Sequence, residues 1–120
     1  MSLENRSAPV FQNWEAVEQT VASSVAESTE QFEPATISNV IDLLRAVSKQ
    51  CPIPNAVTKG YWSTIRLCWK DIEIEVFDDR YELYRFNDGA TDIEYFERTS
   101  GADVSPDLIA KLPKLDRYRD

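Results

Sequence analysis

Apolar and polar residues alternate along three consecutive segments in the middle of the chain, which reads YWSTIRLCWKDIEIEVFDDRYELYRF from residue 61. Alternation with a period of two, carried by β-branched and aromatic residues, is typical of strands with one buried face. The pattern breaks only at Lys70-Asp71 and at Asp78-Asp79, and each break is short enough for a two-residue hairpin loop. We therefore predict three antiparallel strands that form a meander.

Two-residue loops determine which residues of neighbouring strands face one another. Leu67 is then opposite Ile74, and Ile74 is opposite Leu83, on a face that is almost wholly apolar. A shift of one residue would move every side chain to the other face, so this agreement supports the register. The opposite face is predicted to carry Arg66, Glu75 and Glu82 in one row and Cys68, Glu73 and Tyr84 in the next, with Phe77 and Phe86 pointing the same way.

A fourth strand is predicted after the turn signal Asn-Asp-Gly-Ala at positions 87–90, where the sequence TDIEYFE alternates again. A three-residue loop with Gly89 in the left-handed conformation would place Ile93 and Tyr95 on the apolar face. The same loop would place Glu94 and Phe96 on the opposite face, beside the other glutamates.

Two helices are predicted before these strands. Apolar residues at positions 14, 17, 21 and 25 have helical spacing, and Asn13 has the side chain of an N-cap, so the first helix runs from about 13 to 28. The second begins at Pro34, where a missing N–H costs nothing, and ends near Lys49. Its apolar stripe is the wider one, so we expect this helix to be the main one that packs on the sheet.

The rest of the chain completes a single domain of residues 1–120. The sequence Ser105-Pro106-Asp107 is a strong helix start, and Pro113 closes the short helix that follows. Residues 1–10 and 116–120 are polar or charged and are expected to be loose tails. The predicted fold is α+β, with two N-terminal helices packed on one face of a four-stranded antiparallel meander and a short C-terminal helix.

The distribution of charge changes this picture of a plain structural domain. The net charge is −8, and residues 71–97 contain ten acidic and two basic residues while the rest of the chain is balanced. The whole acidic excess therefore lies on the predicted sheet. Such a field disfavours nucleic acid and anionic membranes. It favours a basic protein partner, or else it simply keeps an edge of the sheet soluble.

Location and redox state follow from the same composition. The chain has neither a membrane-length apolar run nor a signal-peptide core, so a cytoplasmic location is the default expectation. Cys51 and Cys68 are then expected to be reduced. Cys68 lies on the acidic face in the predicted register, which would raise its pKa.

Carboxylates are the candidate groups for chemistry. Histidine is absent and there is no glycine-rich phosphate loop, so we expect no cofactor and assign no catalytic or metal-ligating residue. Glu73, Glu75, Glu82 and Glu94 could in principle form an acid/base pair or a hard-cation site. The simpler interpretation is the polar half of an alternating sheet, in which Arg66 partly relieves the repulsion between Glu75 and Glu82.

Aromatic residues divide between the two faces of the predicted sheet. Trp14, Trp69, Tyr81 and Tyr95 are predicted to be in the core. The others point to the acidic face, where they mark a protein interface or are covered by the first or the last helix. An edge strand of the sheet could also pair with another chain, as a homodimer or by strand addition. The aromatic residues predicted on the acidic face are Trp62, Phe77, Tyr84, Phe86 and Phe96.

A set of short sequence features carries a resemblance to other proteins. These features are Asn13-Trp14, Leu43-Leu44, Pro52 and Pro54, Gly60, the alternation from Ile65 to Trp69, and IEVF at 74–77. Over residues 13–86 the chain resembles a diffuse group of small bacterial and phage proteins in which two helices precede an antiparallel meander. This resemblance implies the fold and assigns no activity and no functional residues. Some acidic proteins of this size are antitoxins, immunity proteins or phage inhibitors, an analogy of size and charge alone.

The leading hypothesis is a non-enzymatic protein-interaction module that binds a basic protein surface. It could act as an inhibitor, an antitoxin or immunity-type neutraliser, or a mimic of nucleic-acid charge that itself binds neither nucleic acid nor membrane. The alternatives are a carboxylate-based enzyme or divalent-cation-binding protein, and a structural homodimer through a sheet edge. The predicted partner-binding residues are Trp62, Glu73, Glu75, Phe77, Glu82, Tyr84, Phe86, Glu94 and Phe96.

Overall fold

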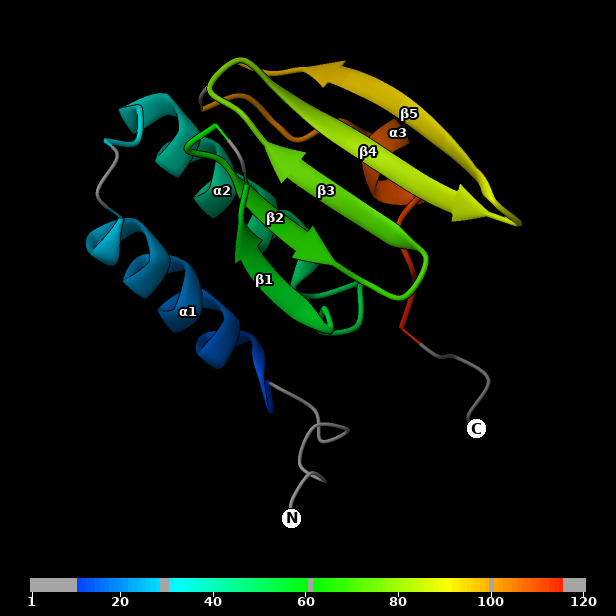
Figure 1. Ribbon diagram of the computed structural model, residues 1–120, viewed down its shortest axis with the longest axis horizontal. Helices are drawn as coiled ribbons and strands as arrows, with labels where there is room; N and C mark the ends of the chain where they lie inside the picture. Colours follow the sequence, from blue (N-terminus) through cyan, green and yellow to red (C-terminus); the bar gives the residue numbers. More distant parts are fainter. Residues whose placement is uncertain (1–10, 29–30, 61, 100, 116–120) are drawn as a thin grey trace.

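A computed structural model describes residues 11–28, 31–60, 62–99 and 101–115 (Figure 1). The fold is α+β, as predicted, with two N-terminal helices, an antiparallel sheet and a short C-terminal helix. The sheet has the strand order β1-β2-β3-β4-β5, so every strand pairs with its neighbour in sequence. The elements are α1 (Trp14–Glu27), α2 (Pro34–Val47), β1 (Ala56–Lys59), β2 (Ile65–Cys68), β3 (Ile72–Val76), β4 (Arg80–Asn87), β5 (Ala90–Glu97) and α3 (Pro106–Ala110).

The strand β1 was not predicted, and the expectation of four strands was wrong. This segment follows the two prolines of residues 51–55, and its four residues are too short for alternation to stand out. The Trp69 indole N–H donates to the Pro52 carbonyl at 2.8 Å, and the Asn55 N–H donates to the Cys68 carbonyl at 2.7 Å. These bonds hold the chain alongside β2, where it continues as an edge strand.

The predicted register of the central strands is confirmed. Leu67 pairs with Ile74, and Ile74 pairs with Leu83. Both hairpin loops are two residues long, as their closing hydrogen bonds show. The Trp69 N–H donates to the Ile72 carbonyl at 2.7 Å, and the Phe77 N–H donates to the Arg80 carbonyl at 2.9 Å. The apolar face lies against the helices and is almost completely buried: Ile65, Leu67, Ile74, Val76, Tyr81 and Leu83.

The turn between β4 and β5 differs from the prediction. Asp88 and Gly89 both have positive φ angles, of 47° and 83°, so they form a two-residue turn instead of a three-residue loop. Tyr84 consequently pairs with Ile93, and Glu82 pairs with Tyr95. This one-residue difference exchanges the two faces of β5 relative to the prediction.

The helices follow the predicted bounds closely. The Asn13 side chain caps α1 by accepting from the Ala16 N–H at 2.8 Å. In Figure 1 α2 and α3 lie behind the sheet and α1 lies beside β1, so one face of the sheet is left without a helix among the described elements. As predicted, α2 buries more than α1: Thr36, Asn39, Val40, Leu43, Leu44 and Val47 against Val17 and Val21.

A buried asparagine on α2 fixes the hairpin between β3 and β4. The Asn39 amide donates to the carbonyls of Phe77 at 2.9 Å and Asp78 at 3.1 Å, and the Tyr81 hydroxyl donates to the Asn39 carbonyl at 2.7 Å. Burial raises the pKa of Tyr81 to about 12. These hydrogen bonds fix the position of the β3–β4 hairpin relative to α2.

A buried ion pair ties the chain after β5 back to α2. Arg98 is almost completely buried, and its guanidinium binds the Asp42 carboxylate. It also donates to the Asp103 carbonyl at 3.2 Å, while the Gly101 N–H donates to the same Asp42 carboxylate at 3.3 Å. The segment that leads to α3 is therefore held by one charged pair.

None of the helices in the described part of the chain is both long enough and apolar enough to cross a membrane. The cytoplasmic location stays a prediction.

Replacement of Arg98 by leucine should lower the free energy of unfolding by about 2–4 kcal/mol, because Asp42 is then left without its counter-charge. Arg85→Leu is a matched control, since Arg85 is partly exposed and its 3.5 Å pair with Glu94 lies at the surface. Urea denaturation of both variants measures the difference. Equal losses of stability in the two variants would show that the Arg98–Asp42 pair stabilises the fold no more than a surface ion pair does.

Candidate functional site

The face of the sheet turned away from α2 and α3 is called the outer face here. The strand pairing places on it one side chain in two from each strand. It holds the charged rows predicted from the sequence, and a groove opens on it. The outer-face residues of β2 to β5 are Arg66, Cys68, Glu73, Glu75, Arg80, Glu82, Tyr84, Phe86, Thr91, Ile93, Tyr95 and Glu97.

Glu75 is a buried carboxylate on this face. Arg66 donates to its Oε1 at 3.1 Å, and the Thr64 hydroxyl donates to its Oε2. The other Arg66 nitrogen donates to Glu73 at 3.2 Å, so one guanidinium serves two carboxylates. Because these donors replace water, the charge of Glu75 is held without an external partner.

Glu82 lies directly opposite Glu75 in the sheet and has its own donors. Arg80 Nε donates to its Oε2 at 2.7 Å, and the Tyr84 hydroxyl donates to its Oε1 at 2.6 Å. The sequence predicted that Arg66 relieves the repulsion between the two glutamates, and the structure confirms that contact. The contribution of Arg80 was not predicted, because it comes from the same strand as Glu82.

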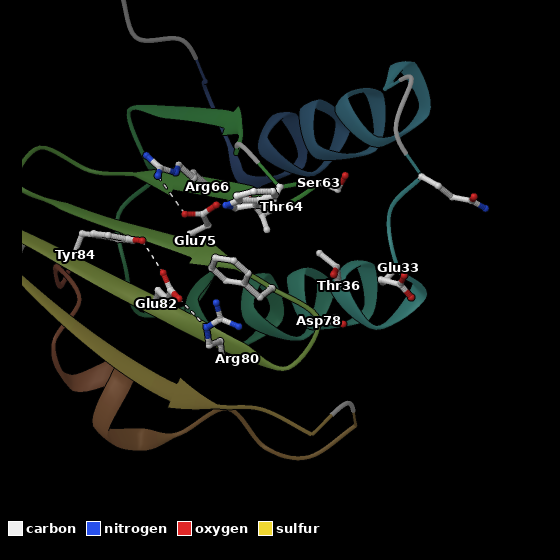
Figure 2. Close-up of a pocket in the computed structure, with 13 residues that line it drawn as sticks. Glu33, Thr36, Ser63, Thr64, Arg66, Glu75, Asp78, Arg80, Glu82 and Tyr84 are labelled. Atoms are coloured by element: carbon white, nitrogen blue, oxygen red, sulfur yellow. Dashed lines mark hydrogen bonds and ion pairs between the residues drawn. The ribbon is translucent and has the colours of Figure 1, made fainter.

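A groove of about 670 Å³ lies between these ion pairs and the N-terminal end of α2. Figure 2 shows Glu75 and Glu82 on the sheet and Glu33 and Thr36 across from them. The ionisable groups that line it are four carboxylates and two guanidiniums, so the lining keeps a negative excess. These groups are Glu33, Glu75, Asp78, Glu82, Arg66 and Arg80.

Large apolar side chains are exposed around the groove. Trp62 is 69% exposed at its rim, and Phe86 is 39% exposed further along β4. Phe77 and Tyr84 are less accessible, because the Arg80 guanidinium lies 3.9 Å from the Phe77 ring centroid and the Arg66 guanidinium 5.6 Å from that of Tyr84. The aromatic character predicted for this face is therefore present, although two of its rings already stack on arginine.

Two predicted site residues lie on the other side of the sheet. Glu94 binds Lys111 at 2.7 Å and Arg85 at 3.5 Å, and Phe96 packs against the core. Ile93, 48% exposed, and Tyr95, 64% exposed, occupy the outer face in their place, so the prediction of Tyr95 as a core residue was wrong. The Asp-Gly pair in the turn is the sequence signal that could have shown this.

The cysteines are both free thiols in the structure. Burial raises the pKa of Cys51. For Cys68, burial and then the nearby Glu73 carboxylate raise the pKa, so the predicted direction is right but burial is the larger cause. Neither thiol has the environment of a reactive cysteine.

Within the described ranges, no group of three His, Cys, Asp or Glu side chains converges as cation ligands would.

The comparisons with known proteins add no relative. No protein-family model matches the chain, and neither the curated proteins nor the solved structures give a significant match.

Gly60 makes room for the Glu75 site. A Cβ at this position would overlap the Thr64 hydroxyl and the Glu75 carboxylate. We expect Gly60→Ala to lower the free energy of unfolding by about 1–3 kcal/mol, because a packed polar contact must be displaced. Thermal and urea denaturation check this value. An unchanged stability would mean that Thr64 and Glu75 move aside at no cost.

The phenol of Tyr84 should make stability depend on alkaline pH. Burial and then the hydrogen bond to Glu82 raise its pKa above the ordinary value of 10.0. The protonated form is favoured in the folded state, so its contribution is complete below about pH 10 and is lost as the pH rises further.

The Tyr84→Phe variant should be less stable than the wild type at pH 7 by about 1–2 kcal/mol, since the bond to a carboxylate is lost. The difference should shrink above pH 10 in urea denaturation series. Tyr95→Phe, an exposed position, is the control. A difference between wild type and Tyr84→Phe that grows with pH would contradict the assignment.

Proposed function

We propose that this protein is a non-enzymatic interaction module that binds a basic surface of another protein through the outer face. The observation that supports this most directly is the exposure of Trp62, Phe86, Ile93 and Tyr95 at a sheet face that no described helix covers. Large apolar side chains that are exposed on one face of a protein can mark a binding surface. Aromatic side chains also supply much of the affinity in protein interfaces.

The charge of the surface supports a basic partner. The protein has a net charge of −8, and the groove lining has more carboxylates than guanidiniums. Exposed Glu33 and Asp78 at the rim are available to a lysine or arginine of the partner. Long-range attraction would speed the encounter, and the rim contacts would orient the complex.

The buried glutamates have a different role from the one the sequence suggested. Glu75 and Glu82 are already neutralised by Arg66 and Arg80, so we assign them to holding the groove in shape. Direct contact is assigned to residues that are exposed or, like Glu73 and Tyr84, half-buried. The proposed contact set is Glu33, Trp62, Glu73, Asp78, Phe86, Ile93 and Tyr95, with Tyr84 partly accessible.

The more specific functions predicted from the sequence would all use the outer face. An inhibitor, an antitoxin or an immunity-type neutraliser would cover a basic region of its target. A mimic of nucleic-acid charge would compete with DNA or RNA for that region. The carboxylate-enzyme alternative has no specific support, because guanidiniums already bind the candidate acid/base pair.

A matched pair of isoleucines tests the proposal. Ile93 on the outer face is 48% exposed, and Ile41 on α2 is 42% exposed beside an apolar groove between α1 and α2. In pull-downs from the native host, Ile93→Ser should lose the bound partner, because a polar group then lies in the interface, while Ile41→Ser should retain it. Circular dichroism confirms that both variants fold.

The reverse pattern would place the interface on the helices and contradict the proposal. A partner whose bound surface is acidic would also contradict it, since like charges would then face each other.

A further inference from the structure

The two edges of the sheet are protected differently. β1 is four residues long and lies beside α1, whereas β5 is eight residues long and is the outermost strand in Figure 1. All eight residues of β5 pair with β4 without an interruption, from Arg80–Glu97 to Asn87–Ala90. Among the described residues, nothing pairs with the other side of β5.

The backbone of β5 presents a regular row of groups to that open side. In an antiparallel pair, hydrogen-bonded and non-bonded residues alternate. The Arg98 N–H donates to the Asp79 carbonyl at 2.9 Å, which assigns the even-numbered residues of β5 to the bonds with β4. The N–H and C=O groups that point outward therefore belong to Thr91, Ile93, Tyr95 and Glu97.

Natural edge strands are commonly blocked by charged side chains, above all lysine, or by a proline, a bulge or short length. β5 is long and has no lysine, proline or bulge. It carries only acidic charges, from Asp92, Glu94 and Glu97, with Asp88 in the preceding turn. Asp92 and Glu97 are exposed, while Glu94 shares its charge with Lys111 and Arg85.

This pattern disfavours a second copy of the chain in the two antiparallel registers centred on Ile93 and on Glu94. An antiparallel pair of β5 strands centred on Ile93 would bring Asp92 of one copy opposite Glu94 of the other. A pair centred on Glu94 would bring the two Glu94 side chains together. Like charges directly opposite each other destabilise a strand pair. A strand with lysine or arginine at those positions would instead be attracted.

We propose that the β5 edge binds an extended, basic segment of a protein partner as an additional strand. The inference rests on the proposed function and specifies the form of the partner. Backbone bonds would come from the outward-pointing groups of β5, and basic side chains would lie beside Asp92, on the face of the strand opposite Ile93 and Tyr95. Ile93 and Tyr95 join this edge to the outer face, so a partner strand and the surface behind it would contact one continuous area.

Two variants of Tyr95 distinguish binding at the β5 edge from binding at the outer face. Tyr95→Ala removes the exposed ring, and Tyr95→Pro removes the ring together with the outward-pointing N–H. Proline is tolerated in edge strands at such positions, because the missing N–H is not used within the sheet. The probe is a fluorescent ten-residue peptide of alternating lysine and valine, and its binding is measured by anisotropy at low salt.

The expected result is binding to the wild type, weaker binding to Tyr95→Ala, and a further loss of about tenfold for Tyr95→Pro, the equivalent of one backbone hydrogen bond. The same peptide with alternate backbone nitrogens methylated should also bind about tenfold or more weakly. This second measurement does not depend on whether the proline variant folds, which circular dichroism checks.

The other outcomes overturn the inference in distinguishable ways. If methylation has no effect and Tyr95→Pro equals Tyr95→Ala, the edge is not used, although binding of a basic surface by the outer face still stands. If a glutamate–valine peptide binds as well as the lysine peptide, charge complementarity fails and the proposed function fails with it. If light scattering shows a dimer that Tyr95→Pro abolishes, the occupant is a second copy.

Discussion

The shared register of β2, β3 and β4 is the constraint on which the rest of the structure depends. It places Leu67, Ile74 and Leu83 in one row against α2, and it places Arg66 beside Glu75 on the opposite face. The hydrophobic burial stabilises the sheet on its helices, and the ion pairs allow two neighbouring glutamates to remain on the sheet. Since the side-chain period is two residues, any slip would bury the charges and expose the core at the same time.

The outer face owes its properties to what the helices leave uncovered. Buried glutamates with internal hydrogen-bond donors lie on this face, and apolar side chains such as Trp62 and Tyr95 are exposed around them. Side chains that hydrogen bonds already hold in place, such as Glu75 and Glu82, lose little conformational entropy when a partner binds. The acidic excess adds attraction for a basic surface, so shape, apolar area and charge all favour the same kind of ligand.

The sequence was sufficient for the fold class, the helix bounds and the central register, because these depend on local period and on short loops. It was insufficient where a difference of one residue in the length of a turn decides which face a side chain occupies. The turn at Asp88-Gly89 accommodates two left-handed residues, and this alone moved Glu94 and Phe96 to the helix side. Distant contacts could not be predicted either, since nothing near Arg98 in the sequence indicates that it binds Asp42 on α2.

The measurement that tests the central claim most directly is a methyl NMR titration of the isoleucine side chains with the lysine–valine peptide. Binding at the outer face and its edge predicts that the Ile93 methyl signal shifts with saturation, while the Ile41 signal on α2 stays in place. A shift of Ile41 without a shift of Ile93 would contradict the account, because it would place the peptide in the apolar groove between α1 and α2.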